Sequence, residues 1–517
     1  MARSEEVKFS EIKTGFLCLI TAAGIIVATE EQRNSGWCFD NSFTHLPEVF
    51  FSHTKPEPVK HAVNVLFNED LANDLGLDVD NLRSSGAQVF SGNEMPAGAV
   101  PIAQAYAGHQ FGHFTNLGDG RAVLLGEHIT PTKQRVDIQL KGSGHTSYSR
   151  SGDGRAVLGP MVREYIISEG MHSLGIPSTR SLAVTATGEN VLRNLPLPGA
   201  ILTRVAESHI RIGTFQYAAA LGDKNNLCQL LNYTVGRHYP DLPNSPDLPF
   251  TFFESVLDKQ ASLVAHWMLV GFVHGVLNTD NVSIAGETID YGPCAFLDVY
   301  HPETVFSSID SRGRYSFEKQ PVMTQWNLAR LAESLLLACS GEQDKAVEKF
   351  VSILETFFER YEKYYLLGTN AKLGLQHQEK EDAALYSDLL DIMKFSQADF
   401  SSTFVGLSQL LEDKNADSVL LKMPGFDHWE QRWRLRLSHE SRSLLEIAKR
   451  MRTVNPVIIP RNLKVEEALA EAESGNTELV QRLLSVLHAP FSETLENRLY
   501  REGAPLDSAP YCTFCGT

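Results

Sequence analysis

Hydrophobic and polar residues alternate in short runs through the first part of the chain, up to about residue 215, with glycine-rich turns between the runs. A period of two is typical of half-buried strands. Strands are therefore predicted at 121–129, 135–144, 180–187 and 199–206. The segment 159–178 instead repeats its apolar residues at helical spacing. Pro160 suits the start of this helix, and Gly175 suits its C-terminal end.

After about residue 216 the apolar spacing becomes that of long amphipathic helices. Such helices are predicted at 252–275, 324–339 and 345–365. Two short β-type pieces, 282–284 and 287–292, interrupt them. Prolines at 456 and 460 mark a change into a final helical pair and a tail. We expect an α+β chain with a β-rich lobe (37–215), a helical lobe (216–450) and a C-terminal helical segment with a CxxC tail (451–517).

Overall composition is that of an ordinary soluble enzyme, with 43% apolar and 21% charged residues among 517. A net charge of −17 repels a phosphate backbone, so no nucleic-acid partner is expected. A nucleotide can still bind in a locally basic pocket.

Seven scattered cysteines indicate a reducing compartment, not a disulfide framework. Cys512 and Cys515 form a C-x-x-C that fits a metal half-site, a redox pair or no function at all. The apolar run 14–29 is shorter than the about 20 residues of a spanning helix. No membrane association is expected unless this run is a true anchor. A buried or mobile extension, or a start codon placed too far upstream, explains it better.

The stretch FVHGVLNTDNVSI, 272–284, resembles a kinase catalytic loop. His274 and Asn281 have the kinase separation, but Val276 stands where a kinase has its catalytic aspartate, and Asp280 is the loop's carboxylate. Asp290 follows in IDYGP, nine residues after Asn281. An amide and a carboxylate oxygen are ligands that Mg²⁺ prefers, so this pair predicts a metal site.

Other residues follow in kinase order. The glycines Gly118 and Gly120 allow a phosphate to approach the backbone, and Arg121 adds charge, although a hairpin turn explains this stretch equally simply. Lys141 ends a predicted strand, where a kinase places its phosphate-pairing lysine. Glu164 on the following helix is its expected partner.

Glu169 is the alternative partner for Lys141. A simpler interpretation is that Lys141, Glu164 and Glu169 are all solvent-exposed side chains without a role in the site. The heptapeptide GDGRAVL also occurs twice, at 118–124 and 152–158, through duplication or convergent phosphate-loop chemistry.

Many blocks together resemble the selenoprotein O family, also known as the YdiU family of protein nucleotidyltransferases. These blocks are YAGHQFG, LGDGRAVLLGE, LKGSG, SGDGRAVL, REYIISE, TRVA, HGVLNTDN, DYGP, GRYSFEKQPVMTQWNLARLAESL, NPVIIPRN and YCTFCGT. The resemblance covers about residue 37 to the end and leaves 1–36 as an extension outside it.

The resemblance implies a protein-kinase-like two-lobe fold that transfers AMP, with ATP bound inverted so that its α-phosphate faces the acceptor. Phosphate-holding cations then correspond to Lys141, Arg204 and Arg211. Nucleotide contacts correspond to Gly118, Gly120, Arg121, Asp153, Gly154 and Asp290. Metal ligands correspond to Asn281 and Asp290, and the proton acceptor to Asp280.

The same resemblance implies Mg²⁺ or Mn²⁺ as cofactor, ATP as co-substrate, and protein acceptors with Ser, Thr or Tyr hydroxyls, with self-modification among them. Uridylyl transfer with Mn²⁺, plain kinase activity and non-catalytic nucleotide binding stay open. Bacterial members are cytoplasmic and eukaryotic members mitochondrial. Many bacterial members carry a cysteine after the metal motif, but the corresponding run here, 306–315, has none, so a redox link from it to the tail is in doubt.

Overall fold

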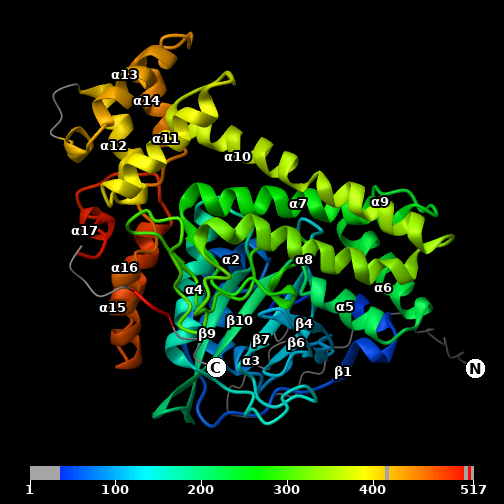
Figure 1. Cartoon of the computed structure of the whole chain (residues 1–517). Coiled ribbons are helices and arrows are strands. Elements are labelled where there is room, and N and C mark those ends of the chain that lie inside the picture. Colours follow the sequence, from blue (N-terminus) through cyan, green and yellow to red (C-terminus); the bar gives the residue numbers. More distant parts are fainter. Residues whose placement is uncertain (1–34, 414–417, 506–510, 514–517) are drawn as a thin grey trace, which may run out of the picture.

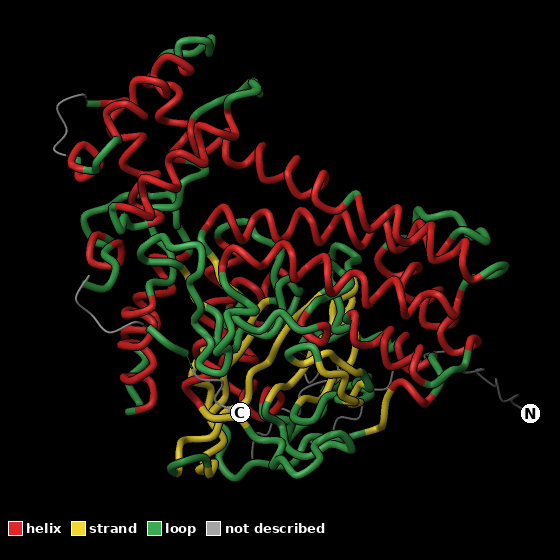
Figure 2. The backbone as a smooth tube through the Cα atoms, in the orientation of Figure 1, coloured by secondary structure: helices red, strands yellow, loops and turns green. Residues whose placement is uncertain are grey.

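A computed structural model describes residues 35–413, 418–505 and 511–513 of the chain. Figures 1 and 2 show strands gathered in the first part of the chain and helices in the second, which is the α+β class that the sequence predicts. The apolar run 14–29 lies outside the described residues. Among the described residues, no helix is long and apolar enough to cross a membrane.

The main sheet has eight strands in the order β1-β3-β6-β7-β10-β9-β2, with β8 paired to β10, and every pairing is antiparallel. Its strands are β1 (Phe51–His53), β2 (Val63–Phe67), β3 (Ile102–Gln104), β6 (Ala122–Ile129), β7 (Arg135–Lys141), β8 (Ala156–Val157), β9 (Arg180–Leu192) and β10 (Pro196–Ala206). Two-stranded pairs are formed by β4 (Ala107–Gln110) with β5 (His113–Asn116), and by β11 (Phe272–Val273) with β12 (Ala295–Phe296). All four strands predicted from alternation are therefore present.

The predicted helix at 159–178 is α4 (Leu158–Ser173), which packs against β9 and β10. Gly175 follows its C-terminal end with φ +77, a left-handed conformation that glycine adopts without strain. Arg163 and Glu164 are buried on different sides of α4. Arg163 pairs with Glu466 of α15 (Asn462–Glu473), which covers α4 together with α16 (Glu478–Leu487), whereas Glu164 faces the sheet and pairs with Lys141 and Arg204. The C-terminal helices thus close over the sheet-rich part, as Figure 1 shows.

Among the remaining helices, α7 packs against both α8 and α10. The remaining helices are α2 (Glu69–Asp74), α3 (Val79–Phe90), α5 (Ile212–Ala220), α6 (Lys224–His238), α7 (Leu248–Val270), α8 (Gln320–Leu335), α9 (Gln343–Glu355), α10 (Phe357–Leu373), α11 (Asp382–Phe395), α12 (Phe400–Glu412), α13 (Phe426–Leu437), α14 (Leu444–Arg452) and α17 (Arg498–Arg501).

The helix predicted at 252–275 is α7, which ends at Val270, and residues 272–273 belong to β11 instead. Other features also differ from the sequence predictions. The single helix predicted at 345–365 is two helices, α9 and α10, which meet at Thr356. The β-type pieces at 282–284 and 287–292 form isolated bridges and no strand. The first part of the chain also contains α2 and α3, which the sequence analysis missed because both helices lie between short β-type runs. The division of the chain into segments stays a prediction.

Candidate active site

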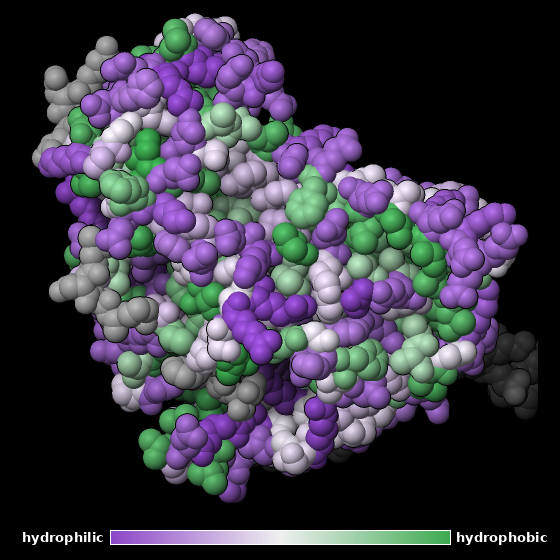
Figure 3. Space-filling view, in the orientation of Figure 1, coloured by the Kyte–Doolittle hydropathy of each residue, from purple (hydrophilic) through white to green (hydrophobic). Residues whose placement is uncertain are grey.

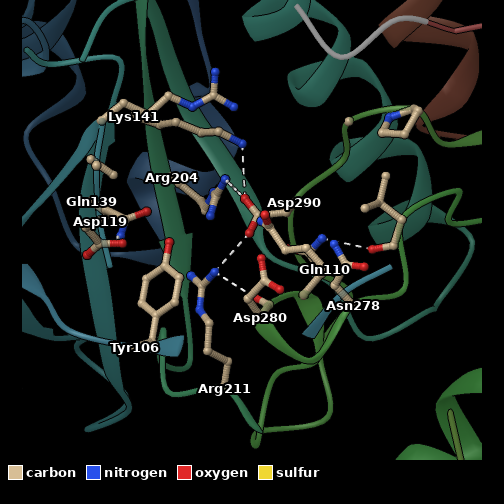
Figure 4. Close-up of a pocket in the computed structure, with 17 residues that line it drawn as sticks. Tyr106, Gln110, Asp119, Gln139, Lys141, Arg204, Arg211, Asn278, Asp280 and Asp290 are labelled. Atoms are coloured by element: carbon tan, nitrogen blue, oxygen red, sulfur yellow. Dashed lines mark hydrogen bonds and ion pairs between the residues drawn. The ribbon is translucent and has the colours of Figure 1, made fainter. Parts of the chain in front are cut away.

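A pocket of about 230 Å³ lies where the sheet meets the loops that precede α8. Figure 4 shows its side chains converging from β4, β7, β10 and the loop after β11. On the surface, Figure 3 shows hydrophilic side chains around a recess on the same face. The lining residues are Tyr106, Gln110, Asp119, Gly120, Arg121, Ala122, Gln139, Lys141, Arg204, Arg211, Val276, Asn278, Asp280, Asn281, Asp290, Gly292 and Pro293.

Lys141 and Glu164 form an ion pair in the structure, with 2.6 Å between Nζ and Oε2. Lys141 reaches this position from the last residue of β7, and Glu164 from the second turn of α4. The alternative partner, Glu169, instead pairs with Arg180 at 2.7 Å and accepts a hydrogen bond from the Ser181 N–H. Glu164, and not Glu169, is therefore the carboxylate that pairs with Lys141.

Asp290 is the point where three cations converge. Its Oδ1 lies 3.1 Å from Lys141 Nζ and 2.6 Å from Arg204 Nη2, and its Oδ2 lies 3.1 Å from Arg211 Nη1. Burial alone would raise the pKa of Asp290, but Arg204, Lys141 and Arg211 together hold that pKa well below its usual range. Arg204 also contacts Glu164 at 2.6 Å, so its guanidinium bridges two carboxylates. Asp290 has φ +62, a strained conformation outside glycine that recurs at functional sites.

Asp280 lies beside this cluster with a different electrostatic character. Burial raises the pKa of Asp280 to about 6, although Arg211 opposes the rise. Its Oδ1 is buried without a hydrogen-bond partner among the described residues. The β4–β5 hairpin covers it so closely that a Cβ at Gly108 would overlap the carboxylate. A carboxylate with this pKa is mostly ionised at neutral pH yet basic enough to accept a proton.

The Asn281 side chain is fixed by its amide, which donates to the Val276 carbonyl at 2.8 Å and leaves the side-chain oxygen as the acceptor end. Asn281 and Asp290 line the same pocket, so an amide and a carboxylate oxygen are available there to a hard cation. His274 is buried outside this pocket, and its Nε2 contacts the Ile289 carbonyl at 3.0 Å. It therefore orders the loop that carries Asp290.

Both copies of GDGRAVL line a second cavity of about 560 Å³, which shares Gly120 and Arg121 with the first. The first copy leads into β6 and the second through β8 into α4. Gly118 (φ +111) and Gly154 (φ +64) have left-handed backbones; a Cβ at Gly118 would overlap Tyr148, and one at Gly154 would overlap the backbone of Gly144. Asp153 in this cavity forms an ion pair with Arg193 at 2.7 Å. The repeated motif is thus two loops that face one space.

Several residues of the first pocket were not singled out from the sequence, namely Tyr106, Gln110, Asp119, Gln139 and Asn278. Burial raises the pKa of Asp119 to about 6, so the pocket holds a second carboxyl that titrates near neutrality. Asp119 lies between the two glycines of the first GDGR loop, and this position is the feature of the sequence that could have identified it as a pocket residue. Tyr106 stacks on the Arg211 guanidinium at 4.5 Å, and only its tertiary position reveals this.

The described part of the tail, 511–513, lies along 306–308, with the Thr513 N–H donating to the Phe306 carbonyl at 2.7 Å. Cys512 lines a third cavity, of about 290 Å³, together with Lys141 and Glu164. Its predicted partner Cys515 lies outside the described residues.

Comparison with known proteins connects this geometry to a family. Residues 36–488 match the family described as "Protein adenylyltransferase SelO". The chain is 52% identical to "Protein nucleotidyltransferase YdiU" of Geobacillus kaustophilus, with 94% of this chain and 100% of that protein covered. It is 53% identical to the protein of the same name from Anoxybacillus flavithermus over 94% of this chain and 100% of the relative. The chain belongs to the SelO/YdiU family and is a nucleotidyltransferase.

Proposed function

We propose that this nucleotidyltransferase transfers AMP from ATP to Ser, Thr or Tyr hydroxyls of proteins and releases pyrophosphate. The observation that carries the proposal is the charge arrangement of the pocket. Three cations converge on Asp290, while the buried carboxylate Asp280 stands apart from that cluster as an available base. Val276 supplies no carboxylate at the position where a kinase has one.

A protein-kinase-like two-lobe fold is part of the same proposal. It is supported by Lys141 at a strand end, by its ion pair with a glutamate of α4, and by the two loops that carry Asn281 and Asp290. A kinase holds its nucleotide with the same set of elements, so the difference in reaction lies in how the nucleotide is oriented.

The two connected cavities support an inverted ATP. The first cavity, with Lys141, Arg204 and Arg211, would take the β- and γ-phosphates. The second, between the GDGR loops, would take the nucleoside, with Asp153 as an acceptor for a ribose hydroxyl or the adenine amino group. Gly120 and Arg121 line both cavities and would then lie near the α-phosphate.

A hard divalent cation, Mg²⁺ or Mn²⁺, fits the oxygen atoms of Asn281 and Asp290. Asp290 is engaged by three cations, so the site suits an ion that arrives with the nucleotide, whose phosphates would take over those cations. When bound, such an ion supplies further neutralisation of phosphate charge.

In the proposed reaction the acceptor oxygen attacks the α-phosphorus. The new bond joins that oxygen to phosphorus, and the bond between the α-phosphorus and the bridging oxygen of pyrophosphate breaks. Asp280 accepts the hydroxyl proton, and Lys141, Arg204 and Arg211 stabilise the negative charge of the leaving pyrophosphate. Acceptor proteins in the cytoplasm agree with a chain whose scattered cysteines suit a reducing compartment.

Intact mass spectrometry of the protein, alone and with a panel of acceptor proteins, tests the proposal. ATP and UTP are each compared with Mg²⁺ and with Mn²⁺, and nucleotides labelled at the α- or the γ-phosphate identify the group transferred. The expected result is a mass gain of one AMP that carries the α-label. Preferential gain of UMP would replace adenylyl with uridylyl transfer. Transfer of the γ-label would mean that the chain is a kinase, and no gain with any nucleotide would refute the proposal.

A further inference from the structure

The guanidinium of Arg314 is held between the β4–β5 hairpin and α8, outside the nucleotide cavities. Its Cζ lies 4.7 Å from the centre of the Trp326 ring. On the hairpin side, a Cβ at Gly112 would stand 3.9 Å from the same Cζ. Arg314 lines neither the first pocket nor the cavity between the GDGR loops.

Tyr315 also lies beside this guanidinium, with its ring centre 5.7 Å from Cζ, but in the described part of the chain the group lacks the anionic partner that an enclosed guanidinium normally has. Its Nε and Nη2 are buried without a hydrogen bond, and no carboxylate of the described residues lies within 4.0 Å of its nitrogens. Arg330 stacks on the same Trp326 ring at 4.8 Å, but it pairs with Glu333. Buried charged donors without acceptors are unfavourable and rare, so Arg314 is the group here that a ligand would satisfy.

The Arg314 cluster is connected directly to the proposed base. The neighbouring Tyr315 donates its hydroxyl to Asn278 Oδ1 at 2.5 Å, and the Phe111 N–H of the hairpin tip donates to the same oxygen at 3.2 Å. Asn278 lines the first pocket, two residues before Asp280, which the same hairpin covers. Arg314 thus lies against the tip of the hairpin, at Gly112, and Asp280 lies under the same hairpin at Gly108.

The segment that carries Arg314 is ordered before any ligand binds. Asp310 accepts hydrogen bonds from the Arg314 N–H at 2.9 Å and the Tyr315 N–H at 2.8 Å. Lys319 donates to the Gly313 carbonyl at 2.9 Å. Preorganisation of this kind lowers the entropy that a binding partner must overcome.

From these contacts we infer that Arg314 binds the carboxylate of an Asp or Glu side chain next to the acceptor hydroxyl of the protein substrate. The inference rests on the proposed function and names the kind of acceptor that the site prefers. Arginine's planar fork matches a carboxylate, and the nucleotide phosphates have cations of their own in the first pocket. With a net charge of −17, the chain repels acidic proteins in general, so a local cation is needed to orient one. Because Nε and Nη2 are covered and Gly112 lies against the guanidinium, binding in this way requires the hairpin tip to move aside.

The test uses the full-length protein and three acceptor peptides that differ only in the residues flanking one hydroxyl, which are Glu, Gln or Lys. The variants are Arg314→Ala, Arg314→Gln and Arg314→Glu, with Arg312→Ala as the control, because Arg312 is an exposed arginine of the same segment. For wild type we expect the lowest KM with the Glu peptide. In Arg314→Ala and Arg314→Gln that KM should rise by about tenfold to a hundredfold, the range for a hydrogen bond to a charged group. The Gln-peptide KM, ATP affinity and thermal midpoint should change little, and Arg314→Glu should prefer the Lys peptide.

Equal loss with all three peptides in every Arg314 variant would show that the residue only stabilises the segment, and would overturn the inference. A wild-type protein that modifies acceptors without charge preference would also overturn it, yet leave the proposed function intact. No transfer to any acceptor would overturn both. A peptide with phosphoserine as the flanking residue completes the set, and a KM below that of the Glu peptide would replace the carboxylate with a phosphate.

Discussion

Asp280→Asn should make the protein more stable and much less active. The substitution keeps the shape of the side chain but removes its ability to accept a proton. Because Asp280 is assigned the hydroxyl proton, the rate of nucleotidyl transfer should fall by about 10²–10⁴-fold, the usual contribution of a general base. ATP binding should be retained, since the phosphates are expected to contact the cations of the pocket.

The expected stability change follows from the pKa. Burial raises the pKa of Asp280 from 3.8 to about 6, so the ionised carboxylate is disfavoured in the folded protein by about 3 kcal/mol at neutral pH. The cost shrinks as the pH falls below the folded-state pKa, to about 0.5 kcal/mol at pH 4, and vanishes below about pH 3, where the carboxyl is protonated in both the folded and the unfolded protein. Asp280→Asn should therefore raise the free energy of unfolding by up to about 3 kcal/mol at pH 7.5 and have little effect at pH 4.

Two assays check this reasoning, namely transfer rates between pH 5 and 8 and urea unfolding at both pH values. With a pKa of about 6, Asp280 is ionised in about a tenth of molecules at pH 5 and about nine tenths at pH 7, so the wild-type rate should rise and then level off. Asp119→Asn is the matched control, because the pKa of Asp119 is also about 6. That variant should keep the pH-dependent rise, whereas Asp280→Asn should lose it. Wild-type activity in Asp280→Asn, or loss of stability at pH 7.5, would refute the assignment.

Three further predictions test the metal pair, the kinase-like loop and the tail. Asp290→Ala should abolish both metal-dependent nucleotide binding, measured by calorimetry, and transfer, measured by intact mass. Asn281→Ala should reduce both less, because water can replace a neutral ligand. Wild-type transfer by Asp290→Ala would exclude this site. Val276→Asp restores the aspartate of the kinase catalytic loop, yet radiolabel assays should detect no γ-phosphate transfer. Strong γ-phosphate transfer would mean that ATP binds in the ordinary kinase orientation. Replacing Cys512 and Cys515 with Ser should leave transfer under reducing conditions intact, and total loss would place the tail in the active site.

Local patterns were sufficient to predict the framework of the site. Alternation located β7 and helical spacing located α4, and these two elements set the positions of Lys141 and Glu164. Glu164 was the expected partner by its place in the kinase order, on the helix that follows the strand of Lys141, and only the structure separates it from Glu169. The loop with Asn281 and Asp290 was recognisable because kinase loops depend on short, fixed separations.

Other parts of the site depend on tertiary contacts that no local pattern encodes. Arg204 lies in a strand, where an arginine is normally exposed, yet it is 2% exposed because Glu164 and Asp290 pair with it from different elements. From the residues alone neither Arg204 nor Arg211 would have been chosen, and the family resemblance supplied both. Asp119 lies inside the GDGR motif, but its sequence position does not show that it is buried. Only the folded structure places its carboxyl in the first pocket.

The position of the charges explains why a kinase-like pocket would favour a different phosphorus atom. In this pocket the cations form one buried group around Asp290, and Arg211 also donates to the backbone carbonyl of Asp280 at 2.8 Å. The most negative part of ATP, its terminal phosphates, should bind where the cations are densest. In the proposed pose the α-phosphate would then lie toward the GDGR loops. A carboxylate restored at position 276 would not move those cations, so under this proposal we expect the arginines, and not the missing aspartate, to determine which phosphorus is attacked.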